Sequence, residues 1–130
     1  MDRDDAEQGS KGRILVVDDH PRVREILGSF LEGAGFQVRT APDGPTGVAL
    51  FSADRFDLIL VDFRMPGMTG LEVATLVRRT NVVIPIVLIT ALAHALEAEV
   101  VANAGINRVL SKPFTWDELM SCLSLIPASR

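Results

Sequence analysis

The chain of 130 residues has no tyrosine, one tryptophan and one cysteine, and aromatic residues make up only 5% of it. The single cysteine, Cys122, cannot form a disulfide within the chain, and its place in an apolar helical pattern predicts a buried thiol. This scarcity of cysteine fits a reducing compartment, and we expect the protein to be cytoplasmic.

The sequence also lacks a long apolar run and a concentration of basic residues. No apolar run approaches the roughly 20 residues that span a membrane, so we expect no membrane partner. The formal net charge of -4 argues against direct nucleic-acid binding, because phosphate backbones are bound by clustered Lys and Arg.

Residues 1–11 are polar and contain no apolar core of a signal peptide. We predict that they form a flexible tail, that residues 12–127 form one domain, and that residues 128–130 are a short C-terminal tail. With 48% hydrophobic and 23% charged residues, the chain is too apolar to be disordered and long enough to bury one core.

Five short runs typical of strands alternate with five segments of helical spacing. The predicted strands cover residues 13–18, 36–40, 57–62, 84–90 and 107–111. The predicted helices cover about 21–33 and 44–53, a segment after the loop 63–69, a less regular segment ending at Gly105, and the segment around 119–126. This alternation predicts a doubly wound α/β fold, with a five-stranded parallel sheet and helices on both faces.

Composition separates central strands from an edge strand. The runs at 14–17, 58–61 and 86–89 consist of Val, Ile and Leu and predict strands that are buried on both faces. Residues 36–39 alternate between apolar and polar, which predicts an edge strand.

Proline, glycine and aspartate mark the ends of the first two helices. Pro21 and Pro45 suit first turns, Asp43 is a candidate N-cap, and Gly33 and Gly35 supply a stop. The apolar residues of the first helix recur at helical spacing and are predicted to face the core. They are Val23, Ile26, Leu27, Phe30, Leu31 and Ala34.

Five polar residues lie at or just past the C-terminal ends of the predicted strands. They are Asp18, Asp19, Asp62, Thr90 and Lys112. Open parallel sheets build their ligand sites outside these strand ends, so we expect the five side chains to converge there. Each residue alone has an ordinary explanation as a helix cap, a strand residue or a surface lysine, but five coincidences at one edge favour a site.

The chemistry of this set suits a cation and a phosphoryl group. Three carboxylates favour a hard ion such as Mg²⁺, with Mn²⁺ as the alternative, and no Cys or His cluster competes for softer metals. Without a cation, repulsion between like charges is expected to raise the pKa of one carboxyl group. A carboxylate is also a nucleophile toward phosphorus, while the Lys112 ammonium and the Thr90 hydroxyl suit phosphoryl oxygens.

Four segments carry a family resemblance. Residues 14–19 (ILVVDD), 62–70 (DFRMPGMTG), 89–91 (ITA) and 112–114 (KPF) resemble the signature segments of the CheY-like response-regulator receiver domain of two-component signalling. The resemblance covers about residues 12–126 in order and spacing. It implies the sheet order 2-1-3-4-5 of this flavodoxin-like fold, which agrees with the central and edge strands assigned above.

The resemblance implies a separate role for each acidic residue. Asp62 would be the phospho-acceptor. Asp18 and Asp19 would hold Mg²⁺, Asp19 directly and Asp18 mainly through water. Asp62 and the backbone carbonyl of Arg64 would complete the set of metal ligands.

The same resemblance implies roles for the residues after the fourth and fifth strands. Thr90 and Lys112 would bind the phosphoryl group, and Ala91 would be the small residue beside it. The Lys112–Pro113 bond would be cis, a geometry that only X-Pro bonds adopt readily.

A signalling function follows from that resemblance. The phosphoryl donor would be a phosphohistidine on a sensor histidine kinase or a histidine phosphotransfer protein. Phosphorylation would change the surface formed by the fourth and fifth helices and the fifth strand, and thereby an unknown downstream protein target. The chain would be no enzyme beyond catalysing its own Asp phosphorylation and dephosphorylation. Neither histidine is expected to take part in this chemistry: His20 would start the first helix near the acidic pair, and His94 would start the fourth helix.

The chain departs from the family pattern in residues that modulate the switch. Val109 stands three residues before the conserved lysine, where receivers usually carry Tyr or Phe, and its single χ1 torsion excludes the usual swing of a ring. Arg64 and Leu92 lie two positions after Asp62 and Thr90, and they are expected to shield the acyl phosphate from water. The sequence therefore predicts an altered output and slow autodephosphorylation.

Three other kinds of protein share parts of this pattern. A haloacid-dehalogenase-like phosphatase needs a second Asp two residues after its nucleophile, where this chain has Arg64. A nucleotide- or flavin-binding module needs a Gly-rich loop after its first strand, where this chain has the sequence DDHP. A docking module that is never phosphorylated, a pseudo-receiver, stays open, because Val109 favours it while the intact acidic set argues against it.

The sequence also leaves the wider protein open. The chain ends about four residues after the last predicted helix, so we expect no output domain to follow. It is either a single-domain regulator that acts by contact or a fragment of a longer regulator or hybrid kinase.

Overall fold

A computed structural model describes residues 10–127 of the chain. The predicted tails at residues 1–9 and 128–130 lie outside the described residues. Ser10 and Lys11 were also assigned to the N-terminal tail, but both are hydrogen-bonded. Lys11 N donates to Gly35 O at 2.9 Å, and Ser10 Oγ donates to Gly12 O at 2.8 Å. These two residues are therefore joined to the fold.

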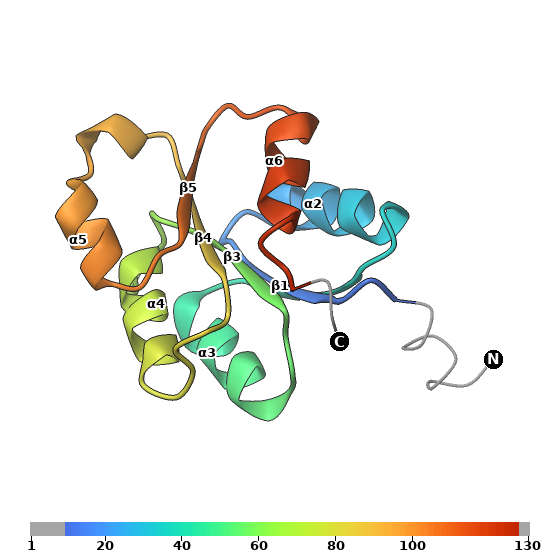
Figure 1. Cartoon of the computed structure of the whole chain (residues 1–130), viewed down its shortest axis with the longest axis horizontal. Helices are drawn as coiled ribbons and strands as arrows, with labels where there is room; N and C mark the ends of the chain where they lie inside the picture. Colours follow the sequence, from blue (N-terminus) through green and yellow to red (C-terminus); the bar gives the residue numbers. More distant parts are fainter. Residues whose placement is uncertain (1–9, 128–130) are drawn as a thin grey trace.

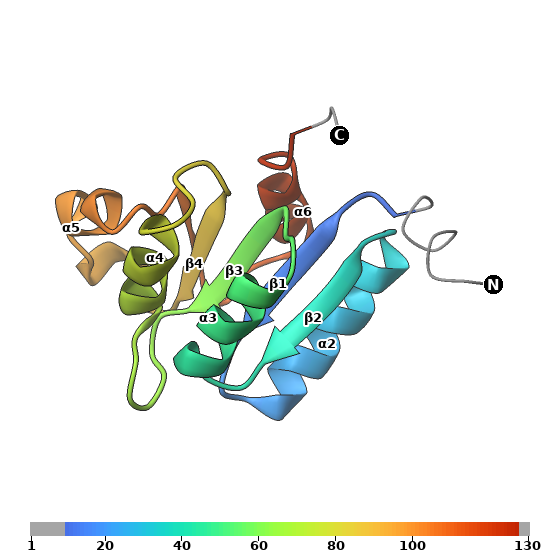
Figure 2. The same cartoon turned by 90° about the horizontal axis from the view of Figure 1, so that it is seen from below.

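Strands and helices alternate in the predicted order. The strands are β1 (Arg13–Val17), β2 (Gln37–Ala41), β3 (Leu58–Asp62), β4 (Ile86–Thr90) and β5 (Arg108–Ser111). The helices are α2 (Pro21–Gly33), α3 (Gly44–Ala53), α4 (Gly70–Arg78), α5 (Ala98–Asn103) and α6 (Trp116–Leu123), with a 3-10 turn η1 (Ala93–Ala95) before α5. All strand pairs are parallel and the sheet order is β2-β1-β3-β4-β5 (Figure 2). The predicted doubly wound fold and strand order are confirmed.

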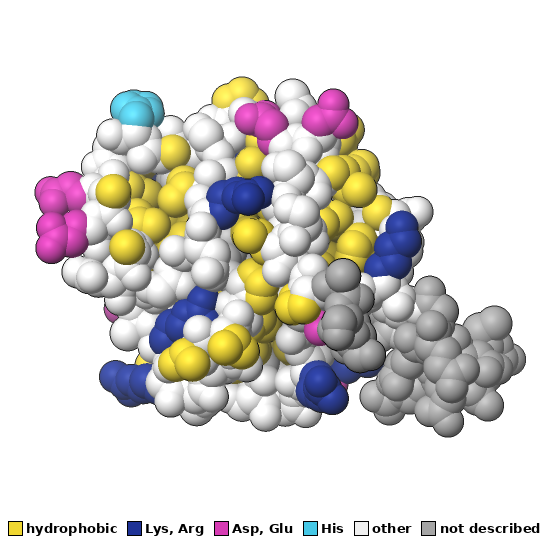
Figure 3. Space-filling view, viewed as in Figure 1, with side chains coloured by type: hydrophobic (Ala, Val, Ile, Leu, Met, Phe, Trp, Pro, Cys, Tyr) yellow, Lys and Arg dark blue, Asp and Glu magenta, His cyan; other side chains and the backbone are white. Residues whose placement is uncertain are grey.

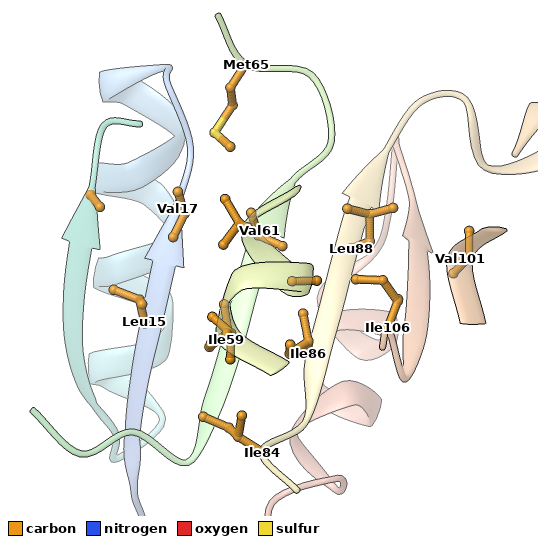
Figure 4. Packing of buried hydrophobic residues seen from close by; sticks show 14 residues of the cluster. Leu15, Val17, Ile59, Val61, Met65, Ile84, Ile86, Leu88, Val101 and Ile106 are labelled. Atoms are coloured by element: carbon orange, nitrogen blue, oxygen red, sulfur yellow. The ribbon is translucent and has the colours of Figure 1, made fainter. Parts of the chain in front are cut away.

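Helices cover the sheet on both faces (Figure 1). Because successive side chains of a strand point to opposite faces, each central strand supplies two cores. Leu15, Ile59 and Leu88 pack with α3, α4 and α5 on one face, where Figure 4 shows the side chains of this cluster. Ile14 and Leu60 pack with α2 and α6 on the other face.

Burial agrees with the assignment of central and edge strands. All five residues of β3 and of β4 are buried, whereas Arg39 and Thr40 of β2 are exposed at the sheet edge. The thiol of Cys122 is fully buried in the core beneath α6, as predicted. Burial raises the pKa of this thiol, so it stays protonated and inert at neutral pH.

The predicted helix starts are present. The Asp43 side chain accepts a hydrogen bond from Thr46 N at 2.8 Å, and hydrogen bonding by the side chain and the backbone of Thr46 lowers the pKa of the Asp43 carboxyl group. Pro21 and Pro45 lie in the first turns of α2 and α3. His20 is the N-cap residue of α2, as expected, although its side chain makes no capping bond.

Some predictions about helices are wrong. Ile26 was predicted to face the core but is 46% exposed, because only one face of α2 packs on the sheet and Ile26 lies outside that contact. His94 was predicted to start the fourth helix but lies in η1. The extended backbone of Leu96 and Glu97 separates η1 from α5, which begins only at Ala98.

The surface agrees with the composition. In the view of Figure 3, basic side chains are scattered among acidic and apolar ones and do not form one continuous patch. Among residues 10–127, no helix is both long enough and apolar enough to cross a bilayer.

Candidate functional site

The strand register brings the predicted polar residues to one edge of the sheet. Asp62 is the last residue of β3 and lies opposite Ile89 of β4, while Thr90 ends β4 opposite Ser111 of β5. Lys112 follows β5 directly, and its backbone N donates to Thr90 O at 2.9 Å. Since these strands are neighbours in the sheet, their C-terminal ends form a single site.

Burial distinguishes these residues from ordinary polar residues. Asp18, Asp62 and Thr90 are 1%, 4% and 4% exposed, and they are the buried polar residues of the described chain. Polar groups are seldom buried without a specific partner, because their desolvation is unfavourable. Their burial therefore argues against an ordinary surface role for Asp18 and Asp62, whereas Thr90 is a strand residue, the last one of β4.

Lys112 contacts the predicted phospho-acceptor directly. Its Nζ donates to Asp62 Oδ1 at 2.8 Å, and the Lys112 side chain is 31% exposed, so one end of the pair reaches solvent. The Lys112–Pro113 peptide bond is cis, as predicted. The Lys112 ammonium thus lies beside Asp62, which is the only carboxylate of β3 and ends the strand.

Burial raises the pKa of the Asp62 carboxyl group above its usual value of 3.8. The hydrogen bond and the charge of Lys112 oppose this rise, and the charges of Asp18 and Asp19 add to it with smaller effects. Repulsion among the carboxylates was predicted to be the cause of a raised pKa. The direction is confirmed for Asp62, but desolvation is the larger cause.

The turn after β1 holds the acidic pair through backbone and side-chain bonds. Asp18 N donates to Ala41 O at 3.1 Å, and Arg24 Nη1 of α2 donates to Asp18 O at 2.7 Å. The Asp18 side chain accepts from His20 N at 2.8 Å through Oδ1. These bonds fix the direction of Asp18 before any ligand is present, which reduces the cost of binding.

Asp19 carries the feature that best fits a cation. Its Oδ1 is buried and makes no hydrogen bond in the described structure, although His20 Nδ1 lies 3.1 Å away. An unsatisfied buried carboxylate oxygen is unfavourable, and a hard divalent ion would satisfy it. The oxygen donors of Asp18 and Asp19 therefore fit the Mg²⁺ that the sequence predicts.

The sequence analysis did not predict that the ring of His20 contacts this pair. His20 Nδ1 lies 3.1 Å from Asp19 Oδ1 and 3.3 Å from Asp18 Oδ1. One ligand atom from each of these three residues lies within 4.8 Å of the other two. The run DDH indicates that His20 starts the first helix near the acidic pair, but it does not indicate the direction of the ring.

Thr90 and Leu92 form a tight turn after β4. Leu92 N donates to Thr90 Oγ1 at 2.9 Å, a bond that uses a lone pair of the hydroxyl oxygen and not its proton. The Thr90 hydroxyl therefore keeps its donor capacity. Ala91 beside it is exposed and Leu92 is half-buried.

Two further residues that are expected to modulate the switch are Arg64 and Val109. Arg64 is exposed in the loop after β3. Val109 of β5 is partly buried and packs against the core cluster under α4 and α5. A valine fixed in this packing agrees with the expectation that this position makes no large swing.

Gly70 sets the distance between α4 and β3, a role that the sequence pattern does not predict. Gly70 N donates to Phe63 O at 3.0 Å, and Thr69 starts α4 with a capping box to Glu72. A Cβ atom on Gly70 would lie 2.6 Å from Asp62 O and 2.7 Å from Leu88 Cδ1. Only a residue without a side chain allows this approach.

We expect Gly70→Ala to destabilise the fold by about 1–3 kcal/mol, the usual range for overpacking a filled core. The backbone of Asp62 must shift, so phosphoryl uptake should fall as well. Urea unfolding measures the stability change. Gly33→Ala is the matched control, because a Cβ there meets nothing within 4 Å. Equal stabilities of the two variants would contradict the close-packing explanation.

Comparison with known proteins agrees with the fold. The family model of the response regulator receiver domain matches residues 14–124. Sensor histidine kinase RcsC of Salmonella typhi is 38% identical over 112 residues, which are 86% of this chain and 12% of that protein. Response regulator MprA of Mycolicibacterium vanbaalenii is 39% identical over 109 residues, 84% of this chain and 47% of that protein. The chain therefore spans less than half of either relative.

A solved structure shows the same architecture. Response regulator protein TrrA of Thermotoga maritima, determined in complex with Mg²⁺-BeF, superposes with a TM-score of 0.81 at 35% sequence identity. The alignment covers 88% of this chain and 98% of that chain. A family model that spans most of the described residues, together with relatives of this identity, shows that the chain belongs to the family of response regulator receiver domains.

Proposed function

We propose that the chain is a phosphorylation-dependent signalling switch in which Asp62 accepts a phosphoryl group from a phosphohistidine. The observation that carries this proposal is the 2.8 Å contact between Lys112 Nζ and the buried carboxylate of Asp62. A buried nucleophile with a partly exposed cation beside it suits phosphoryl transfer, in which positioning and charge supply most of the rate.

The chain's own residues account for the transfer step. Asp62 attacks with a carboxylate oxygen, so an oxygen–phosphorus bond forms while the nitrogen–phosphorus bond of the donor breaks and the leaving imidazole nitrogen takes up a proton. Lys112 neutralises charge on the phosphoryl oxygens, and the Thr90 hydroxyl donates a hydrogen bond to one of them. The domain catalyses only its own phosphorylation and dephosphorylation.

A divalent cation belongs to this proposal. Asp18, Asp19 and Asp62 would hold it together with the carbonyl group of Arg64, and the buried oxygen of Asp19 is the strongest support for this set. When bound, Mg²⁺ supplies positive charge to phosphoryl oxygens and relieves repulsion among the carboxylates. TrrA was determined with Mg²⁺-BeF, which supports Mg²⁺ binding here.

The partner that donates the phosphoryl group would be a sensor histidine kinase or a phosphotransfer protein. TrrA was also determined in complex with histidine kinase ThkA, and a cytoplasmic partner of that kind suits this chain. Ile26 of α2 and Trp116 and Met120 of α6 are 46%, 46% and 41% exposed. Phe30 stacks on Trp116 with ring centroids 4.3 Å apart, which joins the two helices. We assign the partner contact to this apolar surface.

The output of the switch is the surface of α5, β5 and α6. Thr90 moving toward the phosphoryl group would change the packing under η1 and α5, and an unknown downstream protein would read this change. Val109 lacks the ring that usually couples the two movements, which favours a smaller change. A pure docking function is the second candidate, and Val109 is the observation in its favour.

Slow loss of the phosphoryl group is expected from Arg64 and Leu92, because their side chains lie two residues after Asp62 and Thr90 and would restrict the access of water. We expect the double variant Arg64→Ala, Leu92→Ala to dephosphorylate roughly tenfold faster, since water positioning in phosphoryl transfer is worth this much or more. Decay of the phosphorylated protein, followed by intact mass, measures the rate. Equal decay rates of the two proteins would contradict the shielding role.

The proposed function is tested with Mg²⁺ and acetyl phosphate, followed by intact mass. The folded protein should gain one phosphoryl group that hydroxylamine removes, and excess EDTA should prevent the gain. Asp62→Asn should gain none. A folded, Mg²⁺-binding protein that takes up no phosphoryl group from acetyl phosphate or from a phosphorylated kinase would favour the docking function instead.

A further inference from the structure

His20 stands beside the acidic pair in a position that its role as N-cap does not require. Its ring makes no capping bond to α2, and Nδ1 lies 3.1 Å from Asp19 Oδ1 and 3.3 Å from Asp18 Oδ1. The backbone N of His20 donates to Asp18 Oδ1 at 2.8 Å, which ties the residue to the pair. The imidazole therefore faces the two groups that are expected to bind a cation.

The three side chains together form a mixed nitrogen and oxygen donor set. Their ligand atoms lie within 4.8 Å of one another, and the buried Asp19 Oδ1 has no other partner in the described structure. The His20 side chain is 64% exposed, so an ion from solvent reaches it without a change in the core. A neutral imidazole that carries its proton on Nε2 presents the lone pair of Nδ1 to this space.

We propose that His20 is a metal ligand that sets the ion preference of this site toward nitrogen-binding divalent ions such as Co²⁺. This inference rests on the proposed function, because it uses the same acidic pair. Imidazole adds affinity for first-row transition ions, whereas Mg²⁺ prefers oxygen ligands and keeps several waters.

The test is calorimetric titration of the metal-free protein with Mg²⁺ and, separately, with Co²⁺. His20→Asn is the informative variant, because asparagine is itself a favoured N-cap and preserves the start of α2. His94→Asn is the matched control, since His94 is the only other histidine of the chain. Thermal unfolding verifies that both variants fold.

We expect His20→Asn to weaken Co²⁺ binding at least roughly tenfold, because even outer-shell partners of metal ligands cost about that much. Its Mg²⁺ affinity should stay within about twofold of the wild type, since Mg²⁺ is bound through oxygen. His94→Asn should change neither affinity. Proton NMR with Co²⁺ should show shifted imidazole signals that are absent from His20→Asn.

The failure of this inference is distinguishable from failure of the proposed function. Normal Mg²⁺ binding together with an unchanged Co²⁺ affinity in His20→Asn overturns the role of His20 alone. Equal losses of Mg²⁺ and Co²⁺ affinity also overturn it, because they indicate a structural role. A wild-type protein that binds neither ion overturns the metal site of the proposed function and this inference with it.

Discussion

Lys112→Met is expected to slow phosphoryl uptake by roughly 100-fold or more, the loss seen when one preorganised charge-stabilising group is removed from an active site. Lys112 Nζ lies 2.8 Å from Asp62 Oδ1, so no other described cation is placed to replace it at that oxygen. Methionine keeps much of the length and apolar character of the stem while removing the charge. The rate of uptake from acetyl phosphate, measured by intact mass, tests the expectation.

The control for this variant is Lys11→Met. Lys11 is the only other lysine of the chain and is exposed just before β1, at the opposite end of the strands from the site. Its replacement should leave uptake unchanged. If Lys112→Met and Lys11→Met both react at the wild-type rate, Lys112 does not assist the transfer. Lys112→Arg should recover only part of the rate, because a planar guanidinium does not reproduce a compact ammonium.

Asp62→Asn is expected to abolish phosphoryl uptake and at the same time to stabilise the metal-free protein. Burial raises the pKa of Asp62 in the folded state, so the charged carboxylate is less favourable there than in the unfolded chain. Asparagine removes that charge. We expect the Tm to rise by roughly 2–6 °C, the shift that a change of ~1 kcal/mol gives in a chain of this size.

The sign of this effect gives a pH dependence. At a pH above the raised pKa of folded Asp62, the charged carboxylate destabilises the wild type fully. This destabilisation disappears as the pH falls toward the ordinary pKa of 3.8. The difference in Tm between Asp62→Asn and the wild type should therefore shrink on acidification. Thermal unfolding in EDTA over a pH series measures it. A variant that is less stable at neutral pH, or a difference that grows at low pH, would contradict a net destabilisation by the buried charge of Asp62.

Much of the fold could be predicted because strands that are buried on both faces consist of consecutive apolar residues. The central strands β1, β3 and β4 read as unbroken apolar runs, and the polar residue that ends each run marks the functional edge. Asp62 and Thr90 could be placed in this way without any knowledge of tertiary contacts. The sheet order then places Lys112, which follows β5, at the same edge of the sheet.

Other features depend on contacts that period and composition do not encode. The role of Gly70 requires the distance between α4 and the backbone of Asp62, which only the packed structure supplies. The direction of the His20 ring depends on the backbone of the turn after β1, and a helix-start signal says nothing about it. The apolar residues Ile26 and Met120 fit helical spacing, yet both are exposed, because spacing alone does not say how wide a contact the sheet makes.

The most direct measurement is chemical mapping of the phosphoryl group. The protein is phosphorylated with Mg²⁺ and acetyl phosphate and reduced with borohydride, which converts an aspartyl phosphate to homoserine, and its peptides are then sequenced by mass spectrometry. We predict homoserine at position 62 and at no other aspartate of the chain. Homoserine at position 18 or 19, or at none, would contradict the assignment of Asp62 as the phospho-acceptor.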